Sequence, residues 1–242
     1  MVVLGRHSVG YYECDGCGSL QTEEPHWLAE AYTSQGTGYD TGAAQRSVSM
    51  ALTMHAVLDF VGLSKRRACL DFGAGTGLYA RLMRDRGYNY WAADPYNSLH
   101  FMDRFVGDRP FWALVSAFEV AEHMSRPREE WSELFAKALD YIFFTTELYC
   151  GQGQDWPYLA PETGQHVFFY SERALAALGA SCGWRFTMIG VLKTFHRASL
   201  PPLTSTDIQQ RALELLAEHQ RDPYRHAVVD YELLRTAQRK PL

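Results

Sequence analysis

The chain has 242 residues, of which 47% are hydrophobic, and it carries a formal net charge of −5. This length allows one domain with a sizeable core and short additions. The acidic balance offers no broad positive surface, which disfavours a nucleic-acid partner. We expect no transmembrane helix, because no run of about 18 apolar residues is present. The five cysteines show no disulfide framework, so the sequence predicts a cytoplasmic protein.

The first 42 residues predict little regular structure. Residues 1–25 are poor in strand signals and contain a C-x-x-C pair, Cys14 and Cys17. A helix is expected at Pro25–Tyr32, followed by a loop rich in glycine, serine and threonine. We therefore interpret residues 1–42 as an N-terminal, cysteine-containing segment that acts as a lid.

Residues 43–198 alternate between predicted helices and strands. A helix is expected over 45–62, where apolar residues recur at helical spacing. The later elements are expected at Cys69–Phe72, Leu78–Gly87, Tyr88–Ala93, Phe111–Phe118, Arg128–Leu139, Tyr141–Glu147, a helix from a Ser171 cap to Cys182, Trp184–Gly190 and Leu192–His196. This alternation predicts an α/β domain with a mainly parallel sheet between helices.

The remaining residues, 199–242, differ in character. Thr204–Asp207 is a strong helix start, and the amphipathic stretch 208–219 follows it. A second helix is expected over about 224–238. We predict a C-terminal helical extension that packs on the core or joins two copies as a homodimer.

A glycine-rich loop connects the first predicted strand of the domain to a helix. It consists of Asp71, Phe72, Gly73, Ala74, Gly75, Thr76 and Gly77. Glycines at such a turn let a ligand approach the main chain closely, which is typical of a cofactor site. A dinucleotide fingerprint would need another glycine where this chain has Leu78, so a nicotinamide cofactor is disfavoured. The simpler alternative is a turn that only joins strand to helix.

Three charged residues can complete this cofactor site. Asp94 ends the next predicted strand, where its carboxylate can accept hydrogen bonds from both ribose hydroxyls. Asp71 can orient the loop and meet an ammonium group of the cofactor. Arg46 lies at the start of the helix expected over 45–62. Its side chain either reaches the cofactor carboxylate or is exposed on the surface.

These segments resemble the class I S-adenosylmethionine-dependent methyltransferases. The segments that carry the resemblance are 70–77, 93–96, 116–123, 12–18 together with 25–28, and 164–171. All of these segments resemble, more narrowly, a bacterial group found beside glycosyltransferases in surface-polysaccharide clusters. The resemblance covers residues 11–196. It implies a Rossmann-like sheet of seven strands or slightly fewer, closed by an antiparallel strand, with S-adenosylmethionine as the cofactor.

The resemblance also assigns residues near the reacting methyl group. It implies that Phe118 and Glu119 line the methionine side of the cofactor. The usual third strand is not evident between Asp94 and Trp112, so the adenine pocket stays unassigned.

Glu119, Glu122 and His123 are spaced so that a helix would place them on one face. Two carboxylates and an imidazole can bind a divalent cation. The pattern is similar to that of small-RNA 3′-terminal 2′-O-methyltransferases and ubiquinone-biosynthesis O-methyltransferases. That resemblance implies Glu119, Glu122, His123 and His166 as ligands of Mg²⁺ or another divalent ion. The alternative is a metal-free site, in which His123 or His166 is the general base. Both interpretations make Glu119, His123 and His166 catalytic.

Two further features leave alternatives open. Cys14 and Cys17 form half of a zinc site, but no second C-x-x-C is present, so zinc is disfavoured. Tyr149, Trp156 and Tyr158 precede His166 on a loop, where they can stack on a sugar acceptor or form a satellite core.

The sequence therefore predicts an O-methyltransferase for a small or glycan-type hydroxyl acceptor, with transfer in one SN2-like step. Metal coordination would make such a hydroxyl more acidic and fix its position. The alternatives are N- or C-methylation of a nucleotide-linked sugar and a non-catalytic Rossmann-like scaffold module.

Overall fold

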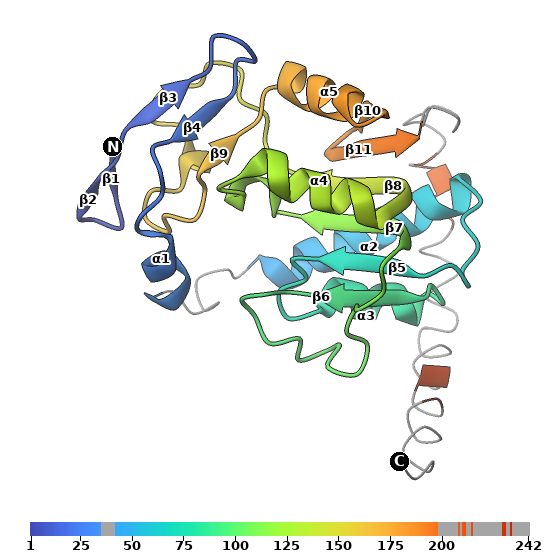
Figure 1. Ribbon diagram of the computed structural model, residues 1–242. Helices are drawn as coiled ribbons and strands as arrows, with labels where there is room; N and C mark the ends of the chain where they lie inside the picture. The colour runs from blue at the N-terminus through green and yellow to red at the C-terminus, as the bar shows by residue number, and fades with distance from the viewer. Residues whose placement is uncertain are drawn as a thin grey trace. The chain divides into compact units, whose positions relative to one another are not determined.

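The computed structural model describes residues 1–34 and 42–197 together with isolated positions of the tail (Figure 1). Those positions are Ile208, Gln210, Arg211, Glu214, Val229, Asp230 and Leu233. The chain divides into two compact units. Unit 1 comprises Met1–Thr41 and Ala117–Pro201, and unit 2 comprises Gly42–Ser116 and Pro202–Leu242.

The central sheet has six strands in the order β10-β11-β8-β7-β5-β6. In chain order their bounds are Cys69–Phe72 (β5), Tyr90–Ala93 (β6), Trp112–Phe118 (β7), Ala138–Thr145 (β8), Trp184–Ile189 (β10) and Leu192–Arg197 (β11). Strand β5 pairs in parallel with β6 and β7, whereas β11 pairs antiparallel with β8 and β10. The predicted α/β class with a closing antiparallel strand is confirmed.

Within the described residues, the central sheet has six strands, which is one fewer than the seven of the full class I sheet. Between β6 and β7 the chain makes a single parallel bridge, which joins Ala92 to Val106. The backbone amide of Ala92 donates to the Phe105 carbonyl, and that of Gly107 donates to the Ala92 carbonyl. The next residues, Gly107–Pro110, are poor strand formers, so the pairing ends there.

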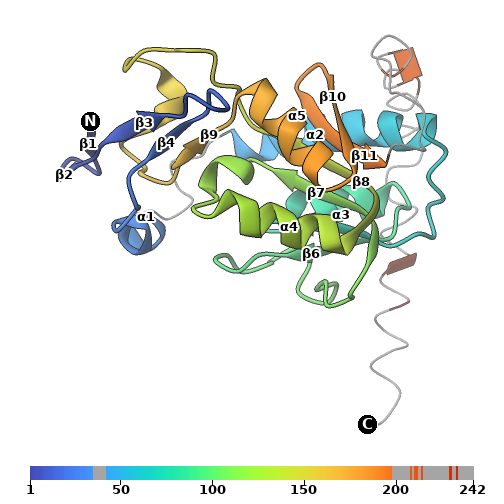
Figure 2. The ribbon, with the colours of Figure 1, turned by 45° about the horizontal axis from the view of Figure 1, so that its top comes forward.

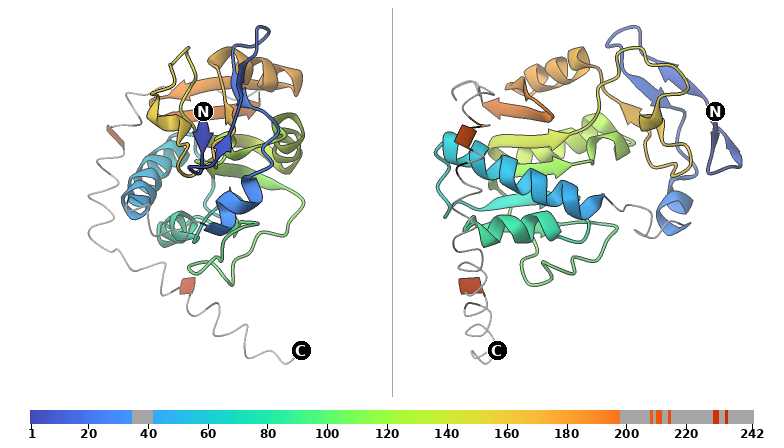
Figure 3. Two further views of the ribbon diagram at one scale, coloured as in Figure 1. Left: turned by 90° about the vertical axis from the view of Figure 1, so that its left-hand side faces the viewer. Right: turned by 180° about the vertical axis from the view of Figure 1, so that it is seen from behind.

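Four helices accompany the sheet, with bounds Ala43–Phe60 (α2), Leu78–Asp85 (α3), Pro127–Lys137 (α4) and Glu172–Ser181 (α5). In unit 1, α4 and α5 cover the same face of β11 (Figure 2). The ring of Phe195 contacts Trp131 and Phe135 of α4, and Gly179 of α5 leaves room for the same ring. In unit 2, α2 and α3 lie side by side (Figure 3).

The N-terminal residues form short strands that the sequence did not reveal, namely β1 (Val2–Val3), β2 (His7–Ser8), β3 (Tyr11–Glu13) and β4 (Leu20–Thr22). The helix expected at Pro25–Tyr32 is present as α1 (Leu28–Ser34), and a further short strand, β9 (Phe168–Phe169), lies much later in the chain. Strand β1 pairs with β2, and β3, β4 and β9 form a three-stranded antiparallel sheet. The expectation that residues 1–25 are poor in strands was wrong. Strands this short show no visible alternation, and β9 is distant in sequence.

Within unit 2, one residue of the tail binds two arginines of α3. Arg84 donates to the Asp230 carboxylate at 2.7 and 2.5 Å, and Arg81 lies 2.7 Å from it. The Arg84 guanidinium also lies over the Phe105 ring, 3.6 Å from its centroid. Apart from isolated positions, the predicted tail helices lie outside the described residues, and dimerisation through them stays a prediction.

Replacing Asp230 with Asn should destabilise the protein. Arg84 and Asp230 are each 8% exposed, so the substitution leaves a buried guanidinium without this counter-ion. We expect the free energy of unfolding to fall by about 3–5 kcal/mol. The control is Asp59→Asn, which removes the Arg211–Asp59 pair, whose side chains are 32% and 40% exposed, and should cost under about 1 kcal/mol. Urea denaturation measures both, and equal losses would contradict this assignment.

Candidate active site

The glycine loop joins β5 to α3 in unit 2, as predicted. Gly73, Gly75 and Gly77 have φ values of +67°, +57° and +83°, which favour glycine strongly. Gly77 is also required for space, because a Cβ atom there would lie 2.8 Å from Cγ of Met102. Every second residue of the loop therefore lacks a side chain, which lets a ligand approach the backbone closely.

Asp94 fastens this loop to the end of β6. Its Oδ2 atom accepts a hydrogen bond of 2.7 Å from the Gly75 amide. Its Oδ1 atom accepts from the amides of Tyr96 and Asn97 at 2.8 and 2.7 Å. These bonds fix the carboxylate beside the loop. Within the described residues Oδ2 has one donor, so it retains a lone pair for another hydroxyl.

Asp71 lies under the same loop and is 3% exposed. Burial raises the pKa of the Asp71 carboxyl to about 8. A hydrogen bond of 3.0 Å from the Ser116 hydroxyl works against this rise, and the charge of Asp94 adds to it. The ligand-free site therefore disfavours a negative charge on Asp71, and a positive group nearby would reverse that preference.

This pKa predicts how stability depends on pH. The folded protein keeps a proton on Asp71 that the unfolded chain loses above about pH 4, so the stability of the ligand-free protein falls from about pH 4 to about pH 8. In Asp71→Asn the side chain does not titrate, so the free energy of unfolding should fall less over this pH range than in the wild type. The difference is at most about 1.4 kcal/mol for each unit by which folding raises the Asp71 pKa. Urea unfolding at both ends of the window measures the effect. An unchanged pH dependence in the variant would contradict it.

Three other predicted residues lie at the ends of elements. Arg46 is exposed in the first turn of α2, and its contact with a cofactor stays a prediction. Phe118 is the partly buried last residue of β7. Glu119 follows it with φ of +55°, unusual for a residue with a side chain, and its amide donates to Thr145 Oγ1 at 3.0 Å.

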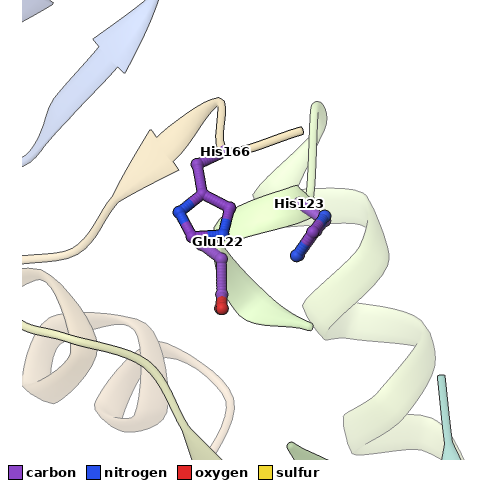
Figure 4. Close-up of side chains that lie close together, drawn as sticks. All are labelled: Glu122, His123 and His166. Carbon is purple, nitrogen blue, oxygen red and sulfur yellow. The ribbon is translucent and has the colours of Figure 1, made fainter. Parts of the chain in front are cut away.

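Glu122, His123 and His166 come together in unit 1 (Figure 4). The first two belong to a short 3₁₀ turn, η2 (Ala121–His123), and His166 precedes β9. One ligand-type atom from each residue lies within 4.8 Å of the others, and no other such trio occurs among the residues the structure describes. Glu119 is not a member of this trio. The backbone is left-handed at Glu119, so the α-helix expected to start there does not form. Its catalytic and metal-binding roles stay predictions.

The Glu122 carboxyl is fully buried. Its side chain is 0% exposed, and neither oxygen has a hydrogen bond of normal geometry within the described structure. Burial raises the pKa of Glu122 to about 8, and the charge of Glu119 adds to the rise. The nearby hydroxyls of Tyr158 and Thr146 offset only part of it. A cation beside Glu122 would stabilise its carboxylate form.

The two histidines carry the lone pairs that a ligand or base needs. His166 Nδ1 lies 2.6 Å from the Tyr158 carbonyl oxygen, which can only accept, so Nδ1 carries the hydrogen and Nε2 does not. Burial lowers the pKa of His166 and lowers that of His123 to about 3, so both rings are neutral at pH 7. Nδ1 of His123 lies 3.1 Å from the Tyr32 hydroxyl.

This donor set fits a divalent cation. One carboxylate and two neutral imidazoles are ordinary ligands for such ions, and a cation would compensate the buried Glu122. The sequence did not reveal the role of Tyr32, because this residue ends a predicted helix and belongs to no motif. It also did not reveal the role of the Tyr158 backbone carbonyl, because a side-chain pattern carries no information about backbone contacts.

The aromatic loop before His166 forms a satellite core. Tyr149, Leu159 and Phe169 are buried together, with Trp156 and Tyr158 packed against them. This arrangement favours the core interpretation over a stacking platform for a sugar.

Cys14 and Cys17 lie in the turn between β3 and β4. Hydrogen bonds from the backbone of Cys17 and then from its side chain lower the pKa of the Cys14 thiol. Among the described residues no further His, Cys, Asp or Glu completes a metal-binding group with them, and all five cysteines are free. A zinc site here stays a prediction.

Comparison with known proteins identifies the family. Residues 42–187 match the family model described as a methyltransferase domain, and the chain belongs to this family. It is an S-adenosylmethionine-dependent methyltransferase, in agreement with its glycine loop and Asp94. A search of curated proteins finds no match.

Two solved structures are similar to this chain, and the first of them shares its fold. The Burkholderia thailandensis 1,6-didemethyltoxoflavin-N1-methyltransferase, with bound S-adenosylhomocysteine, is 13% identical with a TM-score of 0.51, over 79% of this chain and 99% of that one. The magnesium protoporphyrin IX methyltransferase of Synechocystis PCC 6803 is 13% identical with a TM-score of 0.49, over 70% of this chain and 92% of that one. Among the described residues, no helix combines the length and hydropathy needed to span a membrane.

Proposed function

We propose that this methyltransferase methylates a hydroxyl group, and that a divalent cation held by Glu122, His123 and His166 assists the transfer. The observation that carries the proposal is the Glu122 carboxyl, which is fully buried without a hydrogen bond beside two neutral imidazoles. A buried carboxyl of this kind is destabilising unless a proton or a cation compensates it. One carboxylate and two imidazoles suit a divalent transition-metal ion such as Fe²⁺, Mn²⁺ or Zn²⁺ better than Mg²⁺, which prefers oxygen ligands.

The cofactor would bind at the glycine loop of unit 2. Asp94 would accept a hydrogen bond from a ribose hydroxyl through the lone pair that Oδ2 retains. Asp71 would ionise beside the ammonium group of the cofactor, because a nearby positive charge offsets the burial that now raises its pKa. The loop follows the carboxyl end of β5, and η2 follows that of β7, which is where sheets of this class bind ligands.

The residues of unit 1 would prepare the acceptor. A bound cation supplies Lewis acidity, which lowers the pKa of the acceptor hydroxyl. Glu122 and the two imidazoles would hold the cation, which would position the acceptor oxygen for in-line attack on the methyl group. The hydroxyl proton would pass to solvent, and S-adenosylhomocysteine would leave. Without a cation, Nε2 of His166 is the group that accepts the hydroxyl proton, since its lone pair is fixed by the Tyr158 carbonyl.

The acceptor class rests on the sequence resemblance. A small or glycan-type hydroxyl in the cytoplasm follows from the likeness to the group encoded beside glycosyltransferases, and the five free thiols support a reducing compartment. N- or C-methylation of a nucleotide-linked sugar and a scaffold role are the alternatives, and assays of acceptors with labelled cofactor distinguish them.

Calorimetric titration tests the proposal on metal-free protein, first with S-adenosylhomocysteine and then with Mn²⁺. Glu122→Gln should bind the metal at least about tenfold more weakly and keep its affinity for S-adenosylhomocysteine. This variant should fold, because glutamine resembles the neutral carboxyl that burial favours. Glu129→Gln, at an exposed position of α4, is the matched control and should change neither affinity.

Two results would count against the proposal. Methyl transfer that chelators leave unchanged, with wild-type rates in Glu122→Gln, would favour a histidine base without metal. Loss of S-adenosylhomocysteine binding in Glu122→Gln, with the fold intact, would show that the two sites are not separate.

A further inference from the structure

Helix α1 is attached to the loop that carries His166. The indole nitrogen of Trp27, just before α1, donates to the Gly164 carbonyl at 2.8 Å. The side-chain amide of Gln165 donates to the Ala31 carbonyl at 3.2 Å. Trp27 is only 2% exposed, so the attachment is buried at one end. These contacts fix α1 against the residues that immediately precede His166.

From this fixed helix, the Tyr32 hydroxyl reaches His123, 3.1 Å from Nδ1. The contact leaves Nε2 as the nitrogen that can serve as a ligand or a base. Nε2 has a lone pair only if the ring hydrogen is on Nδ1, and then the oxygen of Tyr32 must be the acceptor. A hydroxyl can accept one hydrogen bond while donating its own hydrogen elsewhere, so Tyr32 can fill this role.

His166 has a similar contact through Nδ1, but its partner is a group that can only accept a hydrogen bond. The Tyr158 carbonyl can only accept, so His166 Nδ1 carries the hydrogen. The two rings lie 5.0 Å apart between centroids and share one cluster with Glu122. If both take the same tautomer, both present an Nε2 lone pair to it. If Tyr32 donated instead, His123 would present an N–H group that can neither coordinate a cation nor accept a proton.

We propose that Tyr32 is a positioning residue for His123. Its hydroxyl oxygen accepts the Nδ1 hydrogen, keeps Nε2 unprotonated and holds the ring in place, as the Tyr158 carbonyl does for His166. Helix α1 thereby becomes part of the active site, although none of its residues is a ligand. This inference rests on the proposed function for its consequence, because an oriented Nε2 matters only if it binds a cation or takes a proton.

Imidazole-nitrogen NMR spectra of the full-length, metal-free protein test the positioning role directly, with His123→Gln used to assign the signal. We expect His123 and His166 in the Nδ1–H form in the wild type. In Tyr32→Phe only His123 should shift toward Nε2–H. Tyr158→Phe keeps the backbone carbonyl, so His166 should stay unchanged in that control. An Nε2–H form of His123 in the wild type would overturn the proposal, and so would an unchanged His123 in Tyr32→Phe.

Metal affinity gives the second measurement. Removing an oxygen that orients a ligating histidine typically weakens metal binding by about 10–100-fold, and we expect this for Mn²⁺ in Tyr32→Phe. Thr33→Ala, on the exposed side of α1, should bind Mn²⁺ like the wild type. The spectra decide the positioning role whether or not a metal binds. A wild type that shows both predicted tautomers but binds no metal and transfers no methyl group would refute the proposed function alone.

Discussion

A carboxyl group without exposed surface must be protonated, hydrogen-bonded or paired with a cation, because an isolated buried carboxylate costs several kcal/mol. Glu122 is in this position, and the elements around it provide what a cation would need. The turn after β7 supplies His123 beside it, and the chain before β9 returns His166. The β3–β4–β9 sheet and α1 hold those returning residues in place.

Unit 2 shows the same principle at its cofactor loop. Asp71 is buried with a raised pKa below three glycines, and Asp94 is held by backbone amides at the end of the next strand. Each unit therefore keeps a carboxyl in a state that a positive charge would change. In unit 2 that charge would be the ammonium of the cofactor, and in unit 1 a divalent ion. A positive charge bound beside either carboxyl would favour its ionised form.

The sequence was most informative where residues close in the chain act together. The glycine loop, Asp94 and the alternation of strands and helices led to the correct fold class and family, because these signals are local. The N-terminal strands escaped prediction because each has only two or three residues, and because β9, which pairs with β4, is far away in sequence. The helix expected to place Glu119 and Glu122 on one face does not form, because the backbone is left-handed at Glu119 and a 3₁₀ turn follows at Ala121. Tyr32 and the Tyr158 carbonyl were missed because their roles depend on tertiary contacts.

The central claim is that Glu122, His123 and His166 form the metal centre at which the methyl group is transferred. A crystal structure of the protein with S-adenosylhomocysteine and Mn²⁺, solved with anomalous diffraction data, tests it most directly. The account predicts a manganese peak bonded to Glu122 and to Nε2 of both histidines, and cofactor bound at the glycine loop of unit 2. Fully bound cofactor without a manganese peak at these residues would contradict it.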